Sequence, residues 1–325
     1  MTQIKARILG IGSQTAGKVV TNDDLATFVD TSDAWIRERT GIIQRNYAAN
    51  GETAVSLGTS AARKALAQAQ LEAKDIDLIV CATTTADQTF PSAASMIQRN
   101  FDMPVATCFD VQAVCSGFVY ALGVAEAMLR AGTHKRALVI GTEVMSKLMD
   151  WQDRSTCVLF GDGAGAWVLE SFQASQGLAE RGVHDVKLYT DGKHGDLLYV
   201  DGGVGTTQST GYLRMKGQDV FKHAVNNMSQ AVLETLERNA LTINDIDWVV
   251  PHQANQRILD RLAQKLGIPQ EKMISTLSFH ANTSAASIPL ALDYAVQDGR
   301  IKQGDLILSE AMGGGFTWGS ALYRL

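Results

Sequence analysis

The chain has 325 residues, of which 46% are hydrophobic and 19% charged, so it is long and apolar enough to bury the cores of about two domains. Its net charge of −5 argues against a general nucleic-acid binder, and no apolar run reaches the roughly 18 residues of a membrane span. The first residues lack the apolar core of a signal peptide, and the four cysteines show no C-x-x-C spacing. We therefore expect a cytoplasmic protein with free thiols, with no metal site and with neither nucleic acid nor membrane as a partner.

A short helix near the N-terminus carries the first candidate ligand-binding pair. Ser32 or Asp33 is suited to cap this helix, and Trp35 and Arg39 lie four residues apart on one of its faces. An indole beside a guanidinium suits an adenine ring or a phosphorylated ligand, although a surface tryptophan covered by an arginine is the more common arrangement. A second tryptophan followed by Arg154 is a weaker signal of the same kind.

A polar loop follows the apolar segment that ends near Cys81. Pro91 is placed as the first residue of the next helix, where its missing N–H costs nothing. Phe90 precedes this turn, and it either lines a pocket or fills the core.

Cys115 occupies a turn between a strand and a helix. Residues 105–109 are predicted to form a buried strand and residues 118–130 a helix, so Cys115 lies near a helix N-terminus. The unpaired N–H groups and the helix dipole stabilise an anion there, which predicts a thiol that loses its proton readily and acts as a nucleophile. Ser116 and Gly117 are small enough to let a substrate carbonyl approach the backbone. A lone cysteine is more often a core residue, so the other motifs must decide.

The second half of the chain repeats the first. Three segments recur in the same order, namely 71–80 as 241–250, 136–143 as 305–310, and 161–170 as 313–322. We therefore expect two copies of one α/β unit, residues 1–172 and 173–325, packed as one body. Buried strands alternate with helices in each copy, which favours mostly parallel sheets covered by helices.

The second copy contains the candidate partners of the thiol. His252 follows a strand at 248–250, and the carboxyl ends of strands are where sites are built in α/β folds. Asn282 begins a small polar segment before a helix. Taken alone, a structural histidine and a helix-capping asparagine are the more common interpretations. The repeat nevertheless places Cys115 and Asn282 at nearly equivalent turns, so a two-fold arrangement would bring them together with His252 beside both. Glycines 313–315 would expose backbone N–H groups suited to an oxyanion hole.

Four motifs in this order resemble β-ketoacyl-[acyl-carrier-protein] synthase III, a family of thiolase-like condensing enzymes. They are Ala-Val-Cys115-Ser-Gly-Phe, Pro-His252-Gln-Ala-Asn, Asn282-Thr-Ser-Ala-Ala-Ser and Gly-Gly-Gly-Phe-Thr-Trp-Gly at 313–319. The resemblance covers essentially the whole chain. It implies a duplicated thiolase-like α/β fold in five layers, αβαβα, with two mostly parallel mixed sheets, in a homodimer. Ala281 replaces the usual glycine before Asn282, and Met312 stands where a phenylalanine often precedes the glycines; both bear on acyl-chain preference.

The resemblance also implies a role for each candidate residue. Cys115, His252 and Asn282 would form the catalytic triad, and the N–H groups of Cys115 and Gly314 the oxyanion hole. The remaining assignments are coenzyme A contacts at Trp35, Arg39, Arg154 and Asn255, and an acyl pocket lined by Met312 and by Phe90, which reaches the partner subunit's pocket.

The implied reaction is a decarboxylative condensation. The Cys115 thiolate attacks an acyl-CoA, with acetyl-CoA as the expected primer, and keeps the acyl group as a thioester. Malonyl-acyl carrier protein then enters, and His252 and Asn282 donate hydrogen bonds to its thioester oxygen while CO₂ leaves. The carbanion attacks acyl-Cys115 and gives a 3-oxoacyl-acyl carrier protein, which initiates type II fatty acid biosynthesis. Coenzyme A thioester is a substrate here, and no further cofactor is expected.

A carrier protein is acidic, so a basic docking face is expected. Arg257, Arg261 and Lys265 recur every four residues on the helix after His252, and Lys222 extends the set. An ordinary solvated helix face is the alternative.

Two other functions remain open from the sequence. One is a related condensing enzyme of secondary metabolism that uses the same triad on another acceptor, which activity with malonyl-carrier protein would distinguish. The other is a non-catalytic binding module of the same fold; the intact triad argues against it, and absence of an acyl-enzyme would support it.

Overall fold

The computed structural model describes residues 3–174 and 177–325, and its strands form two main sheets. The first sheet has the order β1 (Gln3–Thr15), β7 (Asp162–Ala174), β6 (Arg136–Val144), β4 (Leu78–Ala82) and β5 (Thr107–Val111). The second has the order β8 (Gly182–Thr190), β13 (Thr317–Arg324), β12 (Leu306–Gly313) and β11 (Trp248–Val249). The strands β1, β7, β6 and β4 correspond in order to β8, β13, β12 and β11, and β5 has no counterpart among the described strands. The repeat in the sequence is therefore a repeat of the fold.

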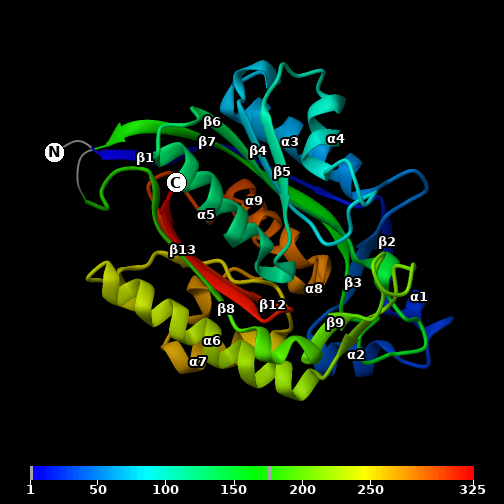
Figure 1. Ribbon diagram of the computed structural model, residues 1–325. Coiled ribbons are helices and arrows are strands. Elements are labelled where there is room, and N and C mark those ends of the chain that lie inside the picture. The colour runs from blue at the N-terminus through cyan, green and yellow to red at the C-terminus, as the bar shows by residue number, and fades with distance from the viewer. Residues whose placement is uncertain (1–2, 175–176) are drawn as a thin grey trace.

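Helices lie in three layers around these sheets (Figure 1). The outer face of the first sheet is covered by α3 (Ala54–Ala69) and α4 (Ala93–Asn100), and that of the second by α6 (Gly217–Arg238) and α7 (Gln256–Leu266). Between the sheets lie α5 (Gly117–Arg130) and α9 (Ser287–Gln297). The result is the five-layered, duplicated thiolase-like α/β architecture that the motifs implied.

Parallel pairing is less dominant than expected. β4 pairs in parallel with β5 and β6, and β11 with β12, because helical crossovers join these strands. β7 pairs antiparallel with β1 and β6, and β13 pairs antiparallel with β12 and β8. Both sheets are therefore mixed, with their parallel part at the end that carries β4 or β11.

The register of the strands also corrects two of the three sequence matches. Leu78 of β4 pairs with Ala137, and the corresponding Trp248 of β11 pairs with Ile307. Residues 136–143 therefore correspond to 306–313, and not to 305–310, so Glu143 corresponds to Gly313. Ala137 also pairs with Leu169, and Ile307 pairs with Tyr323. Leu169 therefore corresponds to Tyr323, which shifts the third match by two residues.

Shorter elements complete the described chain. The strands and α-helices among them are β2 (Lys18–Thr21), α1 (Asn22–Ala26), α2 (Asp33–Thr40), β3 (Gln44–Tyr47), β9 (Leu198–Val200), β10 (Leu213–Met215) and α8 (Leu277–His280). The 3₁₀ turns are η1 (Ala73–Asp75), η2 (Val114–Ser116), η3 (Met145–Leu148), η4 (Gly192–Leu197), η5 (Ile243–Asp245), η6 (Gln270–Lys272) and η7 (Ser284–Ala286). Ser32 caps α2, as expected. Ser92 caps α4, so Pro91 precedes the cap and is not the first helical residue.

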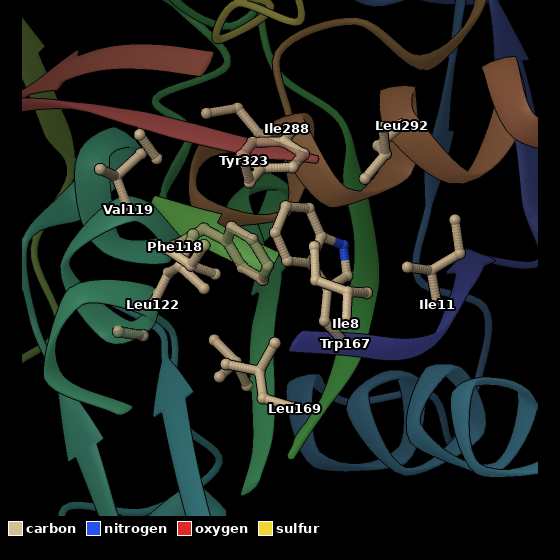
Figure 2. Close-up of a cluster of buried hydrophobic side chains, with 14 of the residues drawn as sticks. Ile8, Ile11, Phe118, Val119, Leu122, Trp167, Leu169, Ile288, Leu292 and Tyr323 are labelled. Atoms are coloured by element: carbon tan, nitrogen blue, oxygen red, sulfur yellow. The ribbon is translucent and has the colours of Figure 1, made fainter. Parts of the chain in front are cut away.

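Aromatic residues from both sheets meet in the central layer (Figure 2). The ring of Trp167 in β7 lies between those of Phe118 in α5 and Tyr323 in β13, with centroids 4.7 and 5.0 Å away and edge-on geometry. All three side chains are buried, so the two sheets share one rigid core that fixes α5 relative to α9.

β5 is not the buried strand that the sequence predicts. It begins at Thr107, the preceding Val105 is fully exposed, and its own residues are only partly buried. β5 forms the edge of the first sheet, which leaves one side of the strand without a neighbour in this chain. Among the helices of the described residues, none has the length and apolar character needed to cross a membrane.

Candidate active site

Cys115 lies in η2, the turn between β5 and α5, as predicted. Its side chain is buried. A Cβ at Gly117 would lie 3.1 Å from that of Ala82 and 3.3 Å from that of Ala285. The small size of Gly117 therefore lets the start of α5 pack closely against β4 and η7.

The resting sulfur is a thiol. Burial raises the pKa of Cys115 to about 12, against the opposing effect of the Ser284 hydroxyl that hydrogen-bonds with the sulfur. A helix N-terminus stabilises a nearby anion by only about 0.3–1 kcal/mol at an exposed site, whereas full burial moves a pKa by up to about 3–5 units. Desolvation therefore outweighs the helix terminus, and the prediction of a readily lost proton is wrong for the ligand-free site.

His252 follows β11, and hydrogen bonds hold both its backbone and its ring. Its backbone N–H donates to the carbonyl of Glu310 at 2.8 Å, and its Nδ1 lies 2.7 Å from the hydroxyl of Ser287. The hydroxyl oxygen also accepts the N–H of Gln253 at 3.4 Å. In the tautomer in which the hydroxyl donates to Nδ1, Nε2 carries the proton and can donate it. Burial lowers the pKa of His252 to about 3, so the imidazole is neutral.

Asn282 is fixed by its own backbone and by η7. Its N–H donates to the carbonyl of Leu159 at 3.0 Å, and its side-chain oxygen accepts the N–H of Ser284 at 2.9 Å. The amide nitrogen is therefore the part of the side chain left to donate. The preceding Ala281 has a φ of 57°, a conformation that favours glycine, which explains why a glycine is usual there.

One cavity of about 740 Å³ brings the three candidate catalytic residues together. Cys115, His252 and Asn282 all line it, and each is no more than 6% exposed. Within the described residues, no group of three or more His, Cys, Asp or Glu side chains could hold a metal ion. The other expected residues that line the cavity are Trp35, Arg39, Asn255, Arg257, Met312 and Lys222.

Two guanidinium groups stack on Trp35. Arg39 lies 4.8 Å from the ring centroid and Arg154 5.1 Å, and Arg154 also donates to the carbonyl of Asp30 at 2.9 Å. Asn255 caps α7 by accepting the N–H of Arg257, and its amide donates to the carbonyl of Arg39. This indole with two cations is a flat, positive surface suited to a nucleotide with phosphates.

The glycines after β12 approach the nucleophile closely. A Cβ at Gly313 would lie 2.6 Å from the backbone nitrogen of Cys115, and one at Gly314 would lie 2.7 Å from the carbonyl oxygen of Leu198. Side chains at these positions are excluded, because the backbone after β12 packs directly against η2 and Leu198.

A second cavity, of about 700 Å³, was not predicted. Val114, the neighbour of Cys115, lines it, and Leu198 lines both cavities. Met145 and Leu148 of η3 give it an apolar wall. Phe90 is 82% exposed, so it does not fill the core, and it lines neither of these two cavities.

The basic residues expected to dock a carrier protein are exposed. Arg257, Arg261 and Lys265 lie on one face of α7, and Lys222 lies on α6. The Lys265 ammonium donates to the side chain of Asn226 at 2.8 Å, which ties α7 to α6.

Two residues that shape the site had no role assigned from the sequence. Gln253 locks the loop around His252 by donating to the carbonyl of Pro251 and accepting the N–H of Thr276. Ser287 orients the imidazole, as described above. Both residues lie in the motifs that contain His252 and Asn282, and that position is the signal that could have found them.

Comparisons with known proteins agree with this geometry. Residues 109–192 match the family model of 3-oxoacyl-[acyl-carrier-protein (ACP)] synthase III, and residues 236–325 match the model of its C-terminal part. A β-ketoacyl-[acyl-carrier-protein] synthase III of Rhizorhabdus wittichii is 58% identical over 320 residues, which cover 98% of this chain and 99% of that protein. The crystal structure of 3-oxoacyl-[acyl-carrier-protein] synthase III from Aquifex aeolicus VF5 is 44% identical, with a TM-score of 0.91 and coverage of 98% of this chain and 100% of that one. The priming β-ketosynthase of the R1128 polyketide pathway is 35% identical, with a TM-score of 0.92 and coverage of 98% and 96%.

Proposed function

This chain belongs to the 3-oxoacyl-[acyl-carrier-protein] synthase III family, and we propose that Cys115, His252 and Asn282 perform the family's reaction in it. The enzyme is an acyltransferase that condenses an acyl-CoA primer with malonyl-acyl carrier protein through an acyl-cysteine. CO₂ is released, and the resulting 3-oxoacyl-acyl carrier protein initiates fatty acid biosynthesis. The observation that carries the residue assignment is the cavity that all three side chains line.

In the first half-reaction, the sulfur of Cys115 attacks the thioester of the primer, for which we propose acetyl-CoA. The proton leaves the sulfur as the carbon–sulfur bond forms, because burial favours the thiol at rest. The N–H groups of Cys115 and Gly314 are the proposed donors to the oxyanion, and the close approach of Gly313 to Cys115 supports this assignment. The carbon–sulfur bond to coenzyme A breaks, coenzyme A leaves as the thiol after its sulfur takes up a proton, and the acyl group remains on the sulfur of Cys115.

In the second half-reaction, His252 and Asn282 stabilise the enolate of the malonyl thioester. Nε2–H of the neutral imidazole and the Asn282 amide nitrogen each donate one hydrogen bond to the thioester oxygen. Negative charge collects on that oxygen as CO₂ leaves, and the carbanion then attacks acyl-Cys115. The bond to CO₂ supplies the electron pair, so no strong base is required.

Trp35, Arg39, Arg154 and Asn255 are proposed to hold the coenzyme A nucleotide. The stacked indole and guanidinium groups suit its adenine and phosphates. Coenzyme A enters as part of the substrate, and we propose that the enzyme uses no separate cofactor.

We further propose a homodimer in which Phe90 completes the partner's acyl pocket. The exposed ring of Phe90 is an apolar surface, and the edge of β5 presents backbone N–H and C=O groups that a strand of a second chain can pair with. Met312 lines the first cavity beside Cys115 and is the proposed pocket residue of the same chain.

Arg257, Arg261, Lys265 and Lys222 are proposed to dock the acidic carrier protein. Arg257 and Lys222 also line the cavity, so the carrier would sit at the opening through which its malonyl group enters.

We divide the chain into halves at residues 1–172 and 173–325, the first with the nucleophile and the second with its two hydrogen-bond donors. A cytoplasmic location is proposed because Cys81, Cys108, Cys115 and Cys157 are all free.

Intact mass spectrometry tests the function directly. Mixing the enzyme with acetyl-CoA should add one acetyl group, and malonyl-acyl carrier protein should then remove it with release of CO₂. Longer and branched acyl-CoAs define the preference of the pocket. A Cys108→Ala control should behave like the wild type, and failure of the wild type to form an acyl-enzyme would contradict the proposal.

Priming of a polyketide pathway is the second candidate, favoured by the similarity to the R1128 ketosynthase. It predicts faster turnover with a secondary-metabolite carrier protein than with the carrier protein of fatty acid synthesis, and the same assay with both carriers separates the two.

A further inference from the structure

The buried carboxylate of Glu143 has no role in the proposed reaction. A single side chain, that of Ser284, lies between it and the sulfur of Cys115. Glu143, near the end of β6, has no exposed surface. It accepts hydrogen bonds from the N–H of Thr84 at 3.1 Å and from the hydroxyl of Thr85 at 2.6 Å. Both donors belong to the loop after β4, and neither is a cation.

A further partner of Glu143 connects it to the nucleophile. Ser284, the first residue of η7, donates its hydroxyl to Oε1 of Glu143 at 3.1 Å. The turn η7 packs directly against η2, which carries Cys115, and the Ser284 hydroxyl is the side-chain hydrogen-bonding group that lowers the pKa of the Cys115 thiol. Ser284 has a φ of 50°, which a serine adopts only when its surroundings hold it there, and such conformations are concentrated at functional sites.

A hydroxyl group has one hydrogen to give, and here two acceptors compete for it. We infer that Glu143 and Ser284 form a positioning pair that controls whether the sulfur of Cys115 is a thiol or a thiolate. This inference rests on the proposed role of Cys115 as the nucleophile. When Glu143 is ionised, Ser284 donates to the carboxylate and can only accept from the thiol. When Glu143 is neutral, the hydroxyl is free to donate to a thiolate.

The electrostatics point in the same direction. Burial raises the pKa of Glu143 to about 7, so its charge changes near neutral pH. The ionised carboxylate raises the pKa of the Cys115 thiol, whereas the Ser284 hydroxyl lowers it. The other titratable group that faces Glu143 is the buried thiol of Cys81 in β4, whose pKa is raised chiefly by burial and further by Asp110 and Glu143.

Alkylation of Cys115 by iodoacetamide measures the thiolate without requiring substrates. The alkylation rate is followed by peptide mass mapping between about pH 5.5 and 9. The logarithm of the rate should rise with pH, flatten near pH 7 as Glu143 ionises, and then rise again. The flat region is expected because the titrations of Glu143 and Cys115 are coupled. If the logarithm of the wild-type rate rises with pH in a straight line of unit slope through this range, the inference is overturned without any variant.

Two variants should shift the rate in opposite directions. Glu143→Gln removes the charge and should alkylate roughly ten-fold faster at pH 8, the effect of one pKa unit, and should lose the flat region. Ser284→Ala removes the hydroxyl and should alkylate roughly ten-fold more slowly at pH 6, where Glu143 is neutral and the hydroxyl donates to the thiolate. Glu310→Gln is the matched control, because Glu310 is equally buried but neither carboxyl oxygen has a hydrogen-bond partner.

A non-specific structural disturbance would not accelerate one variant and slow the other. Slower alkylation of Glu143→Gln would overturn the inference, and so would a change of similar size in Glu310→Gln. If the wild type forms an acyl-enzyme but the profiles of the variants coincide with its own, the positioning pair fails and the proposed function stands. If no acyl-enzyme forms, the proposed function fails.

Discussion

The two turns that meet at the centre of the molecule have the same backbone and different chemistry. Val114 begins η2 with a φ of 48°, and Ser284 begins η7 with a φ of 50°. Each turn leads into one of the two central helices, but η2 presents Cys115 where η7 has Ala285. Duplication therefore supplied two copies of one scaffold, and only one copy keeps the sulfur.

The strands behind these turns differ in a complementary way. Glu143 on β6 reaches η7 through the hydroxyl of Ser284. Its counterpart Gly313 on β12 has no side chain, which lets β12 approach the backbone nitrogen of Cys115 closely. The first half therefore has a carboxylate at the position where the second half has no side chain. Four substitutions test what this difference between the two halves does.

Gly313→Ala should have the largest effect. The new Cβ would lie 2.6 Å from the nitrogen of Cys115, so η2 or β12 must move and an oxyanion donor is displaced. Loss of one such donor costs about 10²–10³ in rate, and acylation by acetyl-CoA, measured by stopped-time mass spectrometry, should fall by that amount. Gly205→Ala, where no atom lies within 4 Å, is the control. Unchanged acylation of Gly313→Ala would show that the reaction does not depend on the close approach of Gly313 to Cys115.

Asn282→Ala should slow the condensation half-reaction and leave the acylation half-reaction unchanged. Acylation of Cys115 should persist, because Asn282 donates to the second substrate. Decarboxylation of malonyl-carrier protein, followed as CO₂ release, should fall about 100-fold. Equal losses in both steps would contradict the assignment of Asn282 to the condensation step.

Arg261→Glu should test whether α7, the helix after β11, docks the carrier protein, a role for which α4, the helix after β4, lacks the charges. α7 displays three exposed cations on one face, whereas α4 has Arg99 alone. Reversal of charge at Arg261, which lines neither cavity, should raise the KM for malonyl-carrier protein roughly ten-fold and leave acetyl transfer from coenzyme A intact. The control is Lys302→Glu, on an exposed loop. The docking surface lies elsewhere if both reversals act alike.

Ala281→Gly should have the smallest effect, and it should stabilise the protein. Ala281 has a φ of 57° and is strained, so glycine should raise the free energy of unfolding by about 1 kcal/mol. Ala286→Gly, in η7 with ordinary helical angles, should lower it by a similar amount. Chemical denaturation of both variants checks the signs, and destabilisation by Ala281→Gly would show that the backbone there is unstrained.

Local spacing predicted local geometry well. Trp35 and Arg39, four residues apart on a helix, stack as expected. The order of the motifs and the repeat also placed Cys115, His252 and Asn282 in one cavity. These predictions depended on contacts within one element or on a duplicated arrangement of elements.

Predictions that depended on burial or on register were less successful. The acidity of Cys115 depends on the desolvation of its surroundings, which no motif contains. The apolar strands of the repeat can be aligned with several offsets, and only the pairing of Leu78 with Ala137 and of Trp248 with Ile307 fixes the correct one. Glu143 and Ser284 are separated by 141 residues, so their contact had no sequence signal.

The most direct test of the central claim is to locate the acyl group. The enzyme should be mixed with isotopically labelled acetyl-CoA, quenched in acid, digested and mapped by mass spectrometry. We expect one label per chain on the peptide that contains Cys115, retained in Asn282→Ala and absent in Cys115→Ala. A label on Cys108 or any other residue, or labelling that survives in Cys115→Ala, would contradict the account.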